Sequence, residues 1–162
     1  MALGLFLAAG CAGADVPTVV LNEIESNGGT PGDWIELYNA GPLPADLSGW
    51  KMKDGDDSHA FYVFPPQTVI RAGGYLVVEE AQFLFGLDAN DSVRLFDSSN
   101  TLVDSFRWTA HAASAFCRCP DSTGAFVETV STKGTANACG QATFLPWPGG
   151  GEVQTIGQAD FF

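Results

Sequence analysis

Short apolar runs with alternating polar positions recur along this chain. Longer segments lack the three- and four-residue apolar spacing of an amphipathic helix. The runs are rich in Val, Ile, Phe, Tyr and Trp and are bounded by Gly, Pro, Asn or Asp, which is typical of strands between turns. An antiparallel β-sandwich of about eight strands is therefore predicted. The predicted strands are residues 18–26, 33–39, 47–53, 60–64, 74–80, 92–97, 101–108 and 125–130.

Turn residues between these runs support the prediction. The segment "DSSN" (97–100) is short enough to join two strands as a hairpin. The segment "EAQFLFGL" (80–87) predicts a helical turn, and we expect its Phe83, Phe85 and Leu87 to close one end of the core.

The two ends of the chain differ from the middle. Residues 1–14, "MALGLFLAAGCAGA", form an apolar run closed by small residues that predicts an export signal too short to span a bilayer. The stretch "LAAGC" resembles a bacterial lipobox and predicts lipidation of Cys11. Plain secretion and an apolar N-terminal strand are the alternatives. Residues 15–143 are expected to form the sandwich.

Residues 144–162 contain Pro146, Pro148 and three consecutive glycines, the composition of a linker. The final "EVQTIGQADFF" predicts the first strand of a following domain. We therefore expect a flexible signal before the sandwich, a flexible linker after it, and a longer parent protein.

Charge narrows the choice of partners. The 162 residues include seven basic and nineteen acidic ones, a formal net charge of −12. Such a surface repels phosphate backbones, so a nucleic-acid partner is not expected, whereas cations would be attracted.

Cysteine spacing favours a disulfide over a metal site. With Cys11 set aside, Cys117, Cys119 and Cys139 remain. "CRC" has one intervening residue, unlike the two of zinc and redox motifs. An exported domain is oxidised, so we predict a Cys119–Cys139 disulfide with Cys117 unpaired. Cys117–Cys139 is the alternative pairing.

Five sequence blocks in order resemble the lamin tail domain in its bacterial extracellular form. They are "VVLNEIES", "DWIELYNAG", "DLSGWKMKD", "FPPQTVIRAGGYLVV" and "FGLDANDSVRLFDSSNTLVDSFRW". The resemblance covers about residues 18–139. It implies an immunoglobulin-like sandwich without catalytic residues, often found beside secreted hydrolases. The basic surface of nuclear lamin tails is missing here, so DNA binding is not implied.

The strand "DWIELYN" holds the most suggestive acids. Strand alternation places Asp33 and Glu36 on opposite faces, so they cannot form the carboxylate pair of a glycosidase. Glu23 or Glu25 lies opposite Glu36 if the first two strands pair, but the register is not fixed by the sequence. We expect Glu23 and Glu36 to be structural, with Glu36 accepting hydrogen bonds from turn amides or an arginine.

The loop "KDGDDSH" (53–59) gathers Asp54, Asp56, Asp57 and His59. Their spacing differs from that of an EF-hand. A solvated hairpin turn is therefore expected, and calcium held with help from residues 88–92 is the alternative.

A serine hydrolase is not expected. The segment 107–121 contains Trp108, His111 and Ser114, but the chain lacks a Gly-x-Ser-x-Gly elbow. We expect a packed tryptophan and a hydrogen-bonded histidine beside the disulfide.

These observations predict an exported, non-catalytic accessory or interaction module at the front of a larger secreted or lipid-anchored protein. Its partner would be a protein or a cell surface, and it would meet the membrane only through the lipid anchor. No cofactor is expected, apart from the calcium alternative. Two other functions stay open. One is the N-terminal part of a secreted phosphoester hydrolase, phytase-like or esterase-like, whose catalytic domain lies beyond residue 162. The other is a calcium-dependent carbohydrate or surface binder.

Overall fold

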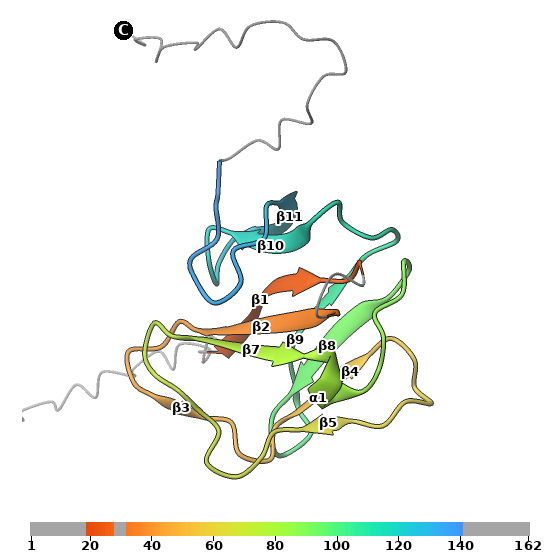
Figure 1. Ribbon diagram of the computed structural model, residues 1–162. Coiled ribbons are helices and arrows are strands. Elements are labelled where there is room, and N and C mark those ends of the chain that lie inside the picture. Colours follow the sequence, from red (N-terminus) through yellow and green to blue (C-terminus); the bar gives the residue numbers. More distant parts are fainter. Residues whose placement is uncertain (1–18, 28–31, 141–162) are drawn as a thin grey trace, which may run out of the picture.

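The computed structural model describes residues 19–27 and 32–140 (Figure 1). The expected export signal with Cys11 and the expected linker at 144–162 lie outside these residues. The described part contains eleven strands and one short helix. They are β1 (Val19–Glu25), β2 (Trp34–Asn39), β3 (Ala45–Asp46), β4 (Lys51–Asp54), β5 (Tyr62–Val63), β6 (Val69–Ile70), β7 (Tyr75–Glu79), α1 (Glu80–Phe83), β8 (Ser92–Phe96), β9 (Leu102–Arg107), β10 (Ala115–Cys119) and β11 (Ala125–Thr129).

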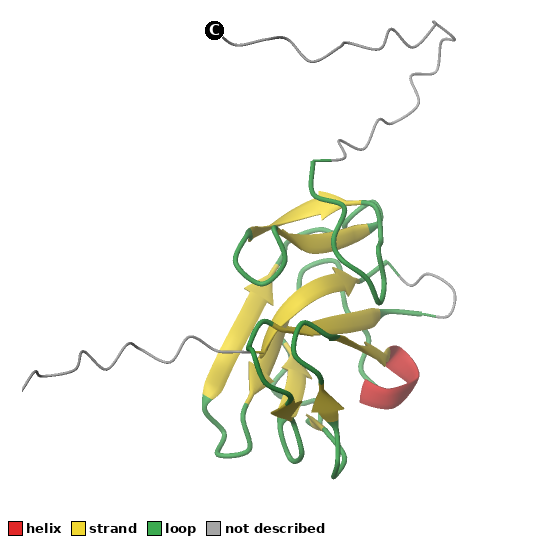
Figure 2. Cartoon of the chain, turned by 90° about the vertical axis from the view of Figure 1, so that its left-hand side faces the viewer, coloured by secondary structure: helices red, strands yellow, loops and turns green. Residues whose placement is uncertain are grey.

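The strands form an all-β, immunoglobulin-like antiparallel sandwich (Figures 1 and 2). One sheet has the order β11-β10-β1-β2-β7 and the other has the order β5-β4-β8-β9, while β3 and β6 form a small separate pair. All described pairings are antiparallel. Strands β5 and β7 are therefore edge strands, one in each large sheet.

All eight predicted strands are present, but the predicted number was too low by three. Strands β3 and β6 are two residues long, too short for an alternating pattern to be recognised. Strand β10 has the sequence "AFCRC", which was interpreted as part of the segment around the disulfide. It is a strand because it pairs with β1 on one side and β11 on the other.

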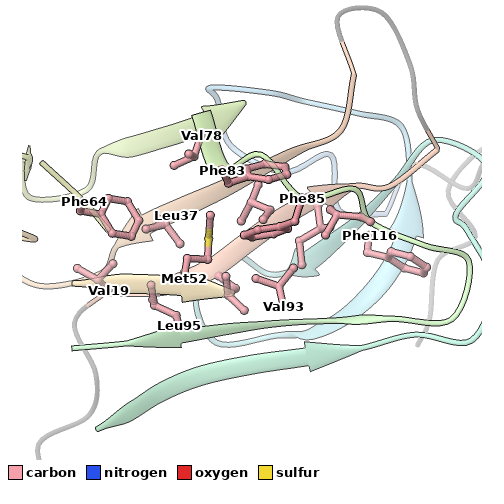
Figure 3. Packing of buried hydrophobic residues seen from close by; sticks show 14 of the residues in the cluster. Val19, Leu37, Met52, Phe64, Val78, Phe83, Phe85, Val93, Leu95 and Phe116 are labelled. Carbon is pink, nitrogen blue, oxygen red and sulfur yellow. The ribbon is translucent and has the colours of Figure 1, made fainter. Parts of the chain in front are cut away.

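The core lies between the two large sheets (Figure 3). Leu37 and Val78 of the five-stranded sheet face Met52 and Leu95 of the four-stranded sheet, and each is at most 1 % exposed. Burial of apolar side chains on this scale is the main favourable term in folding. As the sequence predicted, one end is closed by Phe83, Phe85 and Leu87, all at most 4 % exposed.

A partly buried ion pair links the two sheets at one side. Arg118 on β10 donates to both carboxylate oxygens of Asp104 on β9, at 2.9 and 2.8 Å. Asp104 also accepts the backbone N–H of Leu21 at 3.0 Å, and Arg118 donates to the Leu21 carbonyl at 2.7 Å. The guanidinium lies over the ring of Phe126, 4.6 Å from its centroid. These contacts fix β9 against β1 and β10.

Candidate functional site

Glu23 and Glu36 lie directly opposite each other on β1 and β2. A β-bulge between Leu21 and Glu23 sets this register, so that Leu21 pairs with Leu37 and Glu23 pairs with Glu36. Both glutamates are fully buried. The sequence left open whether Glu23 or Glu25 would meet Glu36, and the bulge decides it.

Four donors hydrogen-bond to these two carboxylates, and three of the four come from the loop that follows β11. Glu23 accepts the N–H and the hydroxyl of Thr132, both at 2.7 Å. Glu36 accepts the N–H of Gly134 at 2.6 Å and the side-chain amide of Asn22 at 3.0 Å. The two acids thus anchor residues 132–134 on the sheet.

Burial raises the pKa of Glu36 from 4.5 to about 7. The negative charges of Glu23 and Asp121 contribute to this rise, while the hydrogen bonds from Asn22 and Gly134 oppose it. A perturbed carboxyl is often a sign of an active site. Here the partners of Glu36 are structural amides of the same domain, so the shift follows from its architectural position.

Cys119 and Cys139 are joined in a disulfide, with their Cα atoms 5.3 Å apart. Cys117 is a free, buried thiol that pairs with Glu23 across β10 and β1. Burial raises the pKa of the Cys117 thiol, and the nearby Glu23 carboxylate adds to the effect. A thiol held protonated is a poor nucleophile, which suits a packing role.

Loss of the disulfide is expected to lower the free energy of unfolding by roughly 3 kcal/mol, because the bond closes a loop of about 20 residues in the unfolded chain. Urea denaturation of the Cys119→Ser/Cys139→Ser variant measures this. The parent with dithiothreitol should match the variant, and the variant should not respond to the reductant. A parent that is equally stable with and without reductant would contradict the prediction.

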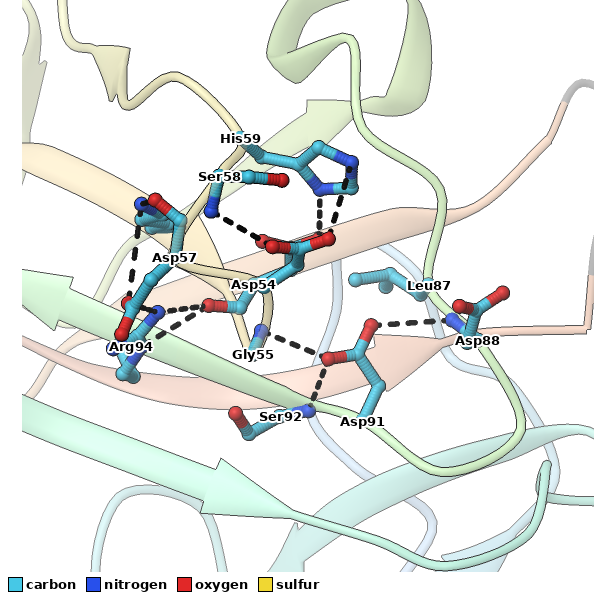
Figure 4. A network of polar contacts seen from close by, with 12 residues as sticks. Asp54, Gly55, Asp57, Ser58, His59, Leu87, Asp88, Asp91, Ser92 and Arg94 are labelled. Atoms are coloured by element: carbon cyan, nitrogen blue, oxygen red, sulfur yellow. Dashed lines mark hydrogen bonds and ion pairs between the residues drawn. The ribbon is translucent and has the colours of Figure 1, made fainter.

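The acidic loop predicted at 53–59 is held by internal contacts (Figure 4). Asp57 pairs with Arg94 at 2.8 Å, and its carbonyl accepts Lys53 at 2.7 Å. Asp56 accepts the N–H of Ser58 at 2.7 Å, a bond that lowers the pKa of Asp56. The loop is a hydrogen-bonded turn.

Asp91 brings the second acidic loop to the first. Its carboxylate accepts the N–H groups of Gly55 at 2.8 Å, Ser92 at 2.7 Å and Asp88 at 3.2 Å (Figure 4). Residues from both loops line one hollow of about 270 Å³, namely Asp54, Gly55, Asp56, His59, Asp88, Asn90, Asp91 and Arg107. Among residues 19–27 and 32–140, no group of three or more His, Cys, Asp or Glu side chains is placed to hold a metal ion.

His59 and Asp54 form a close hydrogen-bonded pair in the hollow. His59 Nδ1 lies 2.5 Å from Asp54 Oδ2. This hydrogen bond raises the pKa of His59, and the charges of Asp54, Asp56 and Asp91 add to it. Asp54 is 1 % exposed, and its other oxygen, Oδ1, has no hydrogen-bond partner among the described residues.

An apolar groove begins on the other side of His59. It has a volume of about 400 Å³ and lies between β5 with its preceding residues and α1 with the residues that follow. Phe83 and Phe85 are buried, whereas Phe61, Val63 and Leu84 are 45, 51 and 83 % exposed. The lining residues are His59, Ala60, Phe61, Tyr62, Val63, Gln82, Phe83, Leu84 and Phe85.

This groove was not predicted from the sequence. The segments 60–64 and 80–87 were interpreted as a strand and a core plug, which accounts for their buried residues only. Alternation along 60–64 indicated that some apolar side chains point outward, but the pairing of the two segments is a tertiary property.

The segment around Trp108 is also structural. Trp108 is 4 % exposed and donates its indole N–H to the Asp88 carbonyl at 2.8 Å. His111 contacts the hydroxyl of Ser26 at 3.2 Å, and Ser114 accepts the N–H of Ser131 at 3.0 Å. The histidine and this serine therefore have separate partners.

Comparison with known families agrees with the fold. The model of the Lamin Tail Domain family matches residues 13–110. The match ends before β10, β11 and the disulfide, whereas the resemblance in the sequence extended to about residue 139. No curated protein matches the chain. In the part of the chain that the structure describes, no helix is long and apolar enough to cross a membrane. The family is an immunoglobulin-like module without catalytic activity, and its model covers more than half of the 162 residues, so this chain belongs to the lamin tail domain family.

Proposed function

We propose that this chain is an exported, non-catalytic interaction module that presents a rigid sandwich to a protein or cell-surface partner. The observation that supports it most is a contrast between acids and apolar side chains. Glu23 and Glu36, the acids considered above as catalytic candidates, accept hydrogen bonds from backbone amides of the domain. Phe61, Val63 and Leu84 meanwhile face solvent beside one groove. Exposed apolar side chains gathered beside a groove are typical of a binding surface.

Packing and hydrogen bonds hold the residues of this surface in place. The groove lies beside the buried end of the core, where Phe83 and Phe85 pack between the sheets. Asp33 on the approach to β2 accepts the N–H of Leu87 at 2.7 Å and so fixes the chain just after the groove. A binding surface held in this way loses little conformational entropy when it binds.

The absence of catalysis is tested directly. The complete chain should not hydrolyse p-nitrophenyl phosphate or bis(p-nitrophenyl) phosphate above the background rate. Glu36→Gln and Asp54→Asn should behave like the parent. Hydrolysis by the parent that either substitution abolishes would overturn the proposal.

Export and lipid anchoring rest on residues 1–14 and on Cys11. Expression in a bacterium with labelled palmitate tests both, with the Cys11→Ser variant as control. We expect label and membrane association in the parent and neither in the variant. Membrane association that persists in Cys11→Ser would contradict the anchor and leave the interaction module intact.

The calcium-dependent alternative receives little support from the acidic hollow. Asp91 already accepts three backbone N–H groups, and Asp57 is paired with Arg94. Calcium requires six to eight oxygen ligands. We therefore expect the melting temperature to be the same in excess chelator and in millimolar calcium. A rise of several degrees with calcium, removed by Asp54→Asn, would favour the alternative.

The second alternative, a phosphoester hydrolase whose catalytic domain lies beyond residue 162, stays a prediction. The family match supports a non-catalytic module for the present chain, and such a module can equally serve a neighbouring hydrolase domain as its partner. Sequencing of the gene beyond the codon for Phe162 decides between the two.

A further inference from the structure

We infer that the groove and the acidic hollow together bind an extended segment of a partner polypeptide that carries an apolar side chain next to a basic one. This inference rests on the proposed function and specifies its binding surface. The groove is the apolar half, lined by residues 59–63 and 82–85. The hollow is the acidic half, and His59 lines both.

Leu84 is the most unusual residue of the groove. It ends α1 with φ 61° and ψ 17°, in the left-handed region that glycine and asparagine prefer. Its side chain is also 83 % exposed. Both features disfavour leucine in the isolated domain. A strained backbone and an exposed apolar side chain at one position indicate a function for that side chain.

Edge strands explain why the partner would be extended. Among the described strands β5 pairs with β4 alone, so it is the edge of its sheet. Its outer side leaves backbone groups free to pair with an added strand. Residues of β5 line the groove together with residues 82–85, so a segment lying along β5 would lie beside the groove and present an apolar side chain to it.

Charge selects the composition of the segment. The hollow is lined by four aspartates, Asp54, Asp56, Asp88 and Asp91, against two basic side chains, His59 and Arg107. Arg107 donates to Asn90 at 3.3 Å. Asp54 Oδ2 is hydrogen-bonded to His59, while the other oxygen, Oδ1, is buried without a hydrogen-bond partner among the described residues. With a net charge of −12 on the whole chain, a lysine or arginine beside the apolar residue would be favoured.

Three capped peptides test the inference against the complete, ¹⁵N-labelled chain. They are acetyl-Lys-Val-Phe-Lys-amide, acetyl-Glu-Val-Phe-Glu-amide and acetyl-Lys-Ser-Ser-Lys-amide. We expect saturable amide shifts at residues 59–63 and 82–85 with the first peptide and none with the third, which lacks apolar side chains. The acidic peptide should bind at least about fivefold more weakly, since each exposed charge pair contributes modestly.

Two substitutions of exposed leucines form a matched pair. Leu84→Asn removes the apolar side chain and suits the left-handed backbone, so it should abolish the shifts while the melting temperature stays equal or rises. Leu43→Asn alters a leucine that is 73 % exposed but does not line the groove, so it should bind like the parent. The third variant, Asp88→Asn, should weaken binding of the basic peptide alone.

Three results of the peptide titrations overturn the inference. They are shifts absent from the groove amides, Leu84→Asn binding as well as the parent, and equal binding of the basic and acidic peptides. Shifts of the groove amides on simple dilution would identify a second copy of the chain as the occupant and would also overturn it. The proposed function is tested separately by the phosphoester assay. If the chain is inactive in that assay, the proposal of an interaction module still holds, and the module would bind its partner through a different surface.

Discussion

The Asp104→Ala variant is expected to unfold with a free energy about 4 kcal/mol lower than that of the parent. The side chains of Asp104 and Arg118 are only 15 and 17 % exposed. Removal of the carboxylate leaves a guanidinium without its counter-ion and the Leu21 N–H without its acceptor. Urea denaturation followed by tryptophan fluorescence measures the change.

A surface ion pair provides the matched control. Asp57 contacts Arg94 at the same 2.8 Å, but its side chain is 85 % exposed. Asp57→Ala should therefore cost less than about 1 kcal/mol. The double variant Asp104→Leu/Arg118→Met should recover much of the loss, because apolar replacement of both partners removes the unpaired charge. If Asp104→Ala and Asp57→Ala lower the free energy of unfolding by the same amount, the ion pair between the sheets contributes no more to stability than a surface ion pair, and the prediction is wrong.

Acidification is expected to stabilise the domain through Glu36. The pKa of this carboxyl is raised from 4.5 to about 7 in the folded state. The folded protein therefore binds a proton more tightly than the unfolded chain does. The stabilisation is complete below pH 4.5 and is lost as the pH rises through 7. It amounts to about 3 kcal/mol, most of which is lost between pH 5 and pH 8.

The comparison with Glu36→Gln isolates this contribution. Other acids, such as Asp46, Asp56 and Asp97, have lowered pKa values and act in the opposite direction, since their contribution is lost as the pH falls. These contributions are the same in the parent and in the variant, so they cancel when the free energy of unfolding of the variant is subtracted from that of the parent. This difference should rise as the pH falls from 8 to 5. Asn22 and Gly134 donate to different oxygens of Glu36, and glutamine has only one oxygen, which adds a constant offset. A difference that is flat with pH would mean that Glu36 stays ionised throughout.

The Asp104–Arg118 ion pair and Glu36 hold in place the parts of the domain that lie outside the family match. Strands β10 and β11, the disulfide and the loop at 131–137 all follow residue 110, where the match ends. Arg118 ties β10 to the sandwich, and Glu36 ties the loop to β2. The Asp104 and Glu36 variants therefore measure how firmly the C-terminal part is attached. The binding groove, at residues 59–63 and 82–85, lies within the matched part.

The sequence by itself determined the local features. Alternation of apolar residues, bounded by turn residues, identified eight strands because side chains on a strand face a core at every second position. It also placed Phe83, Phe85 and Leu87 in the core, because an apolar cluster without a strand period has few other places to go. The residues of five sequence blocks, together with the order of the blocks, were enough to indicate the family.

Only the tertiary structure decided which distant residues meet. Glu23 faces Glu36 because one bulged residue shifts the register, and a shift of one residue is invisible in a local pattern. Strand β10 exists because β1 and β11 supply its hydrogen bonds. The groove joins residues about 20 positions apart that the packing of two sheet edges brings together. Local patterns record which way a side chain points along its own element, whereas contacts between elements depend on how the whole chain closes.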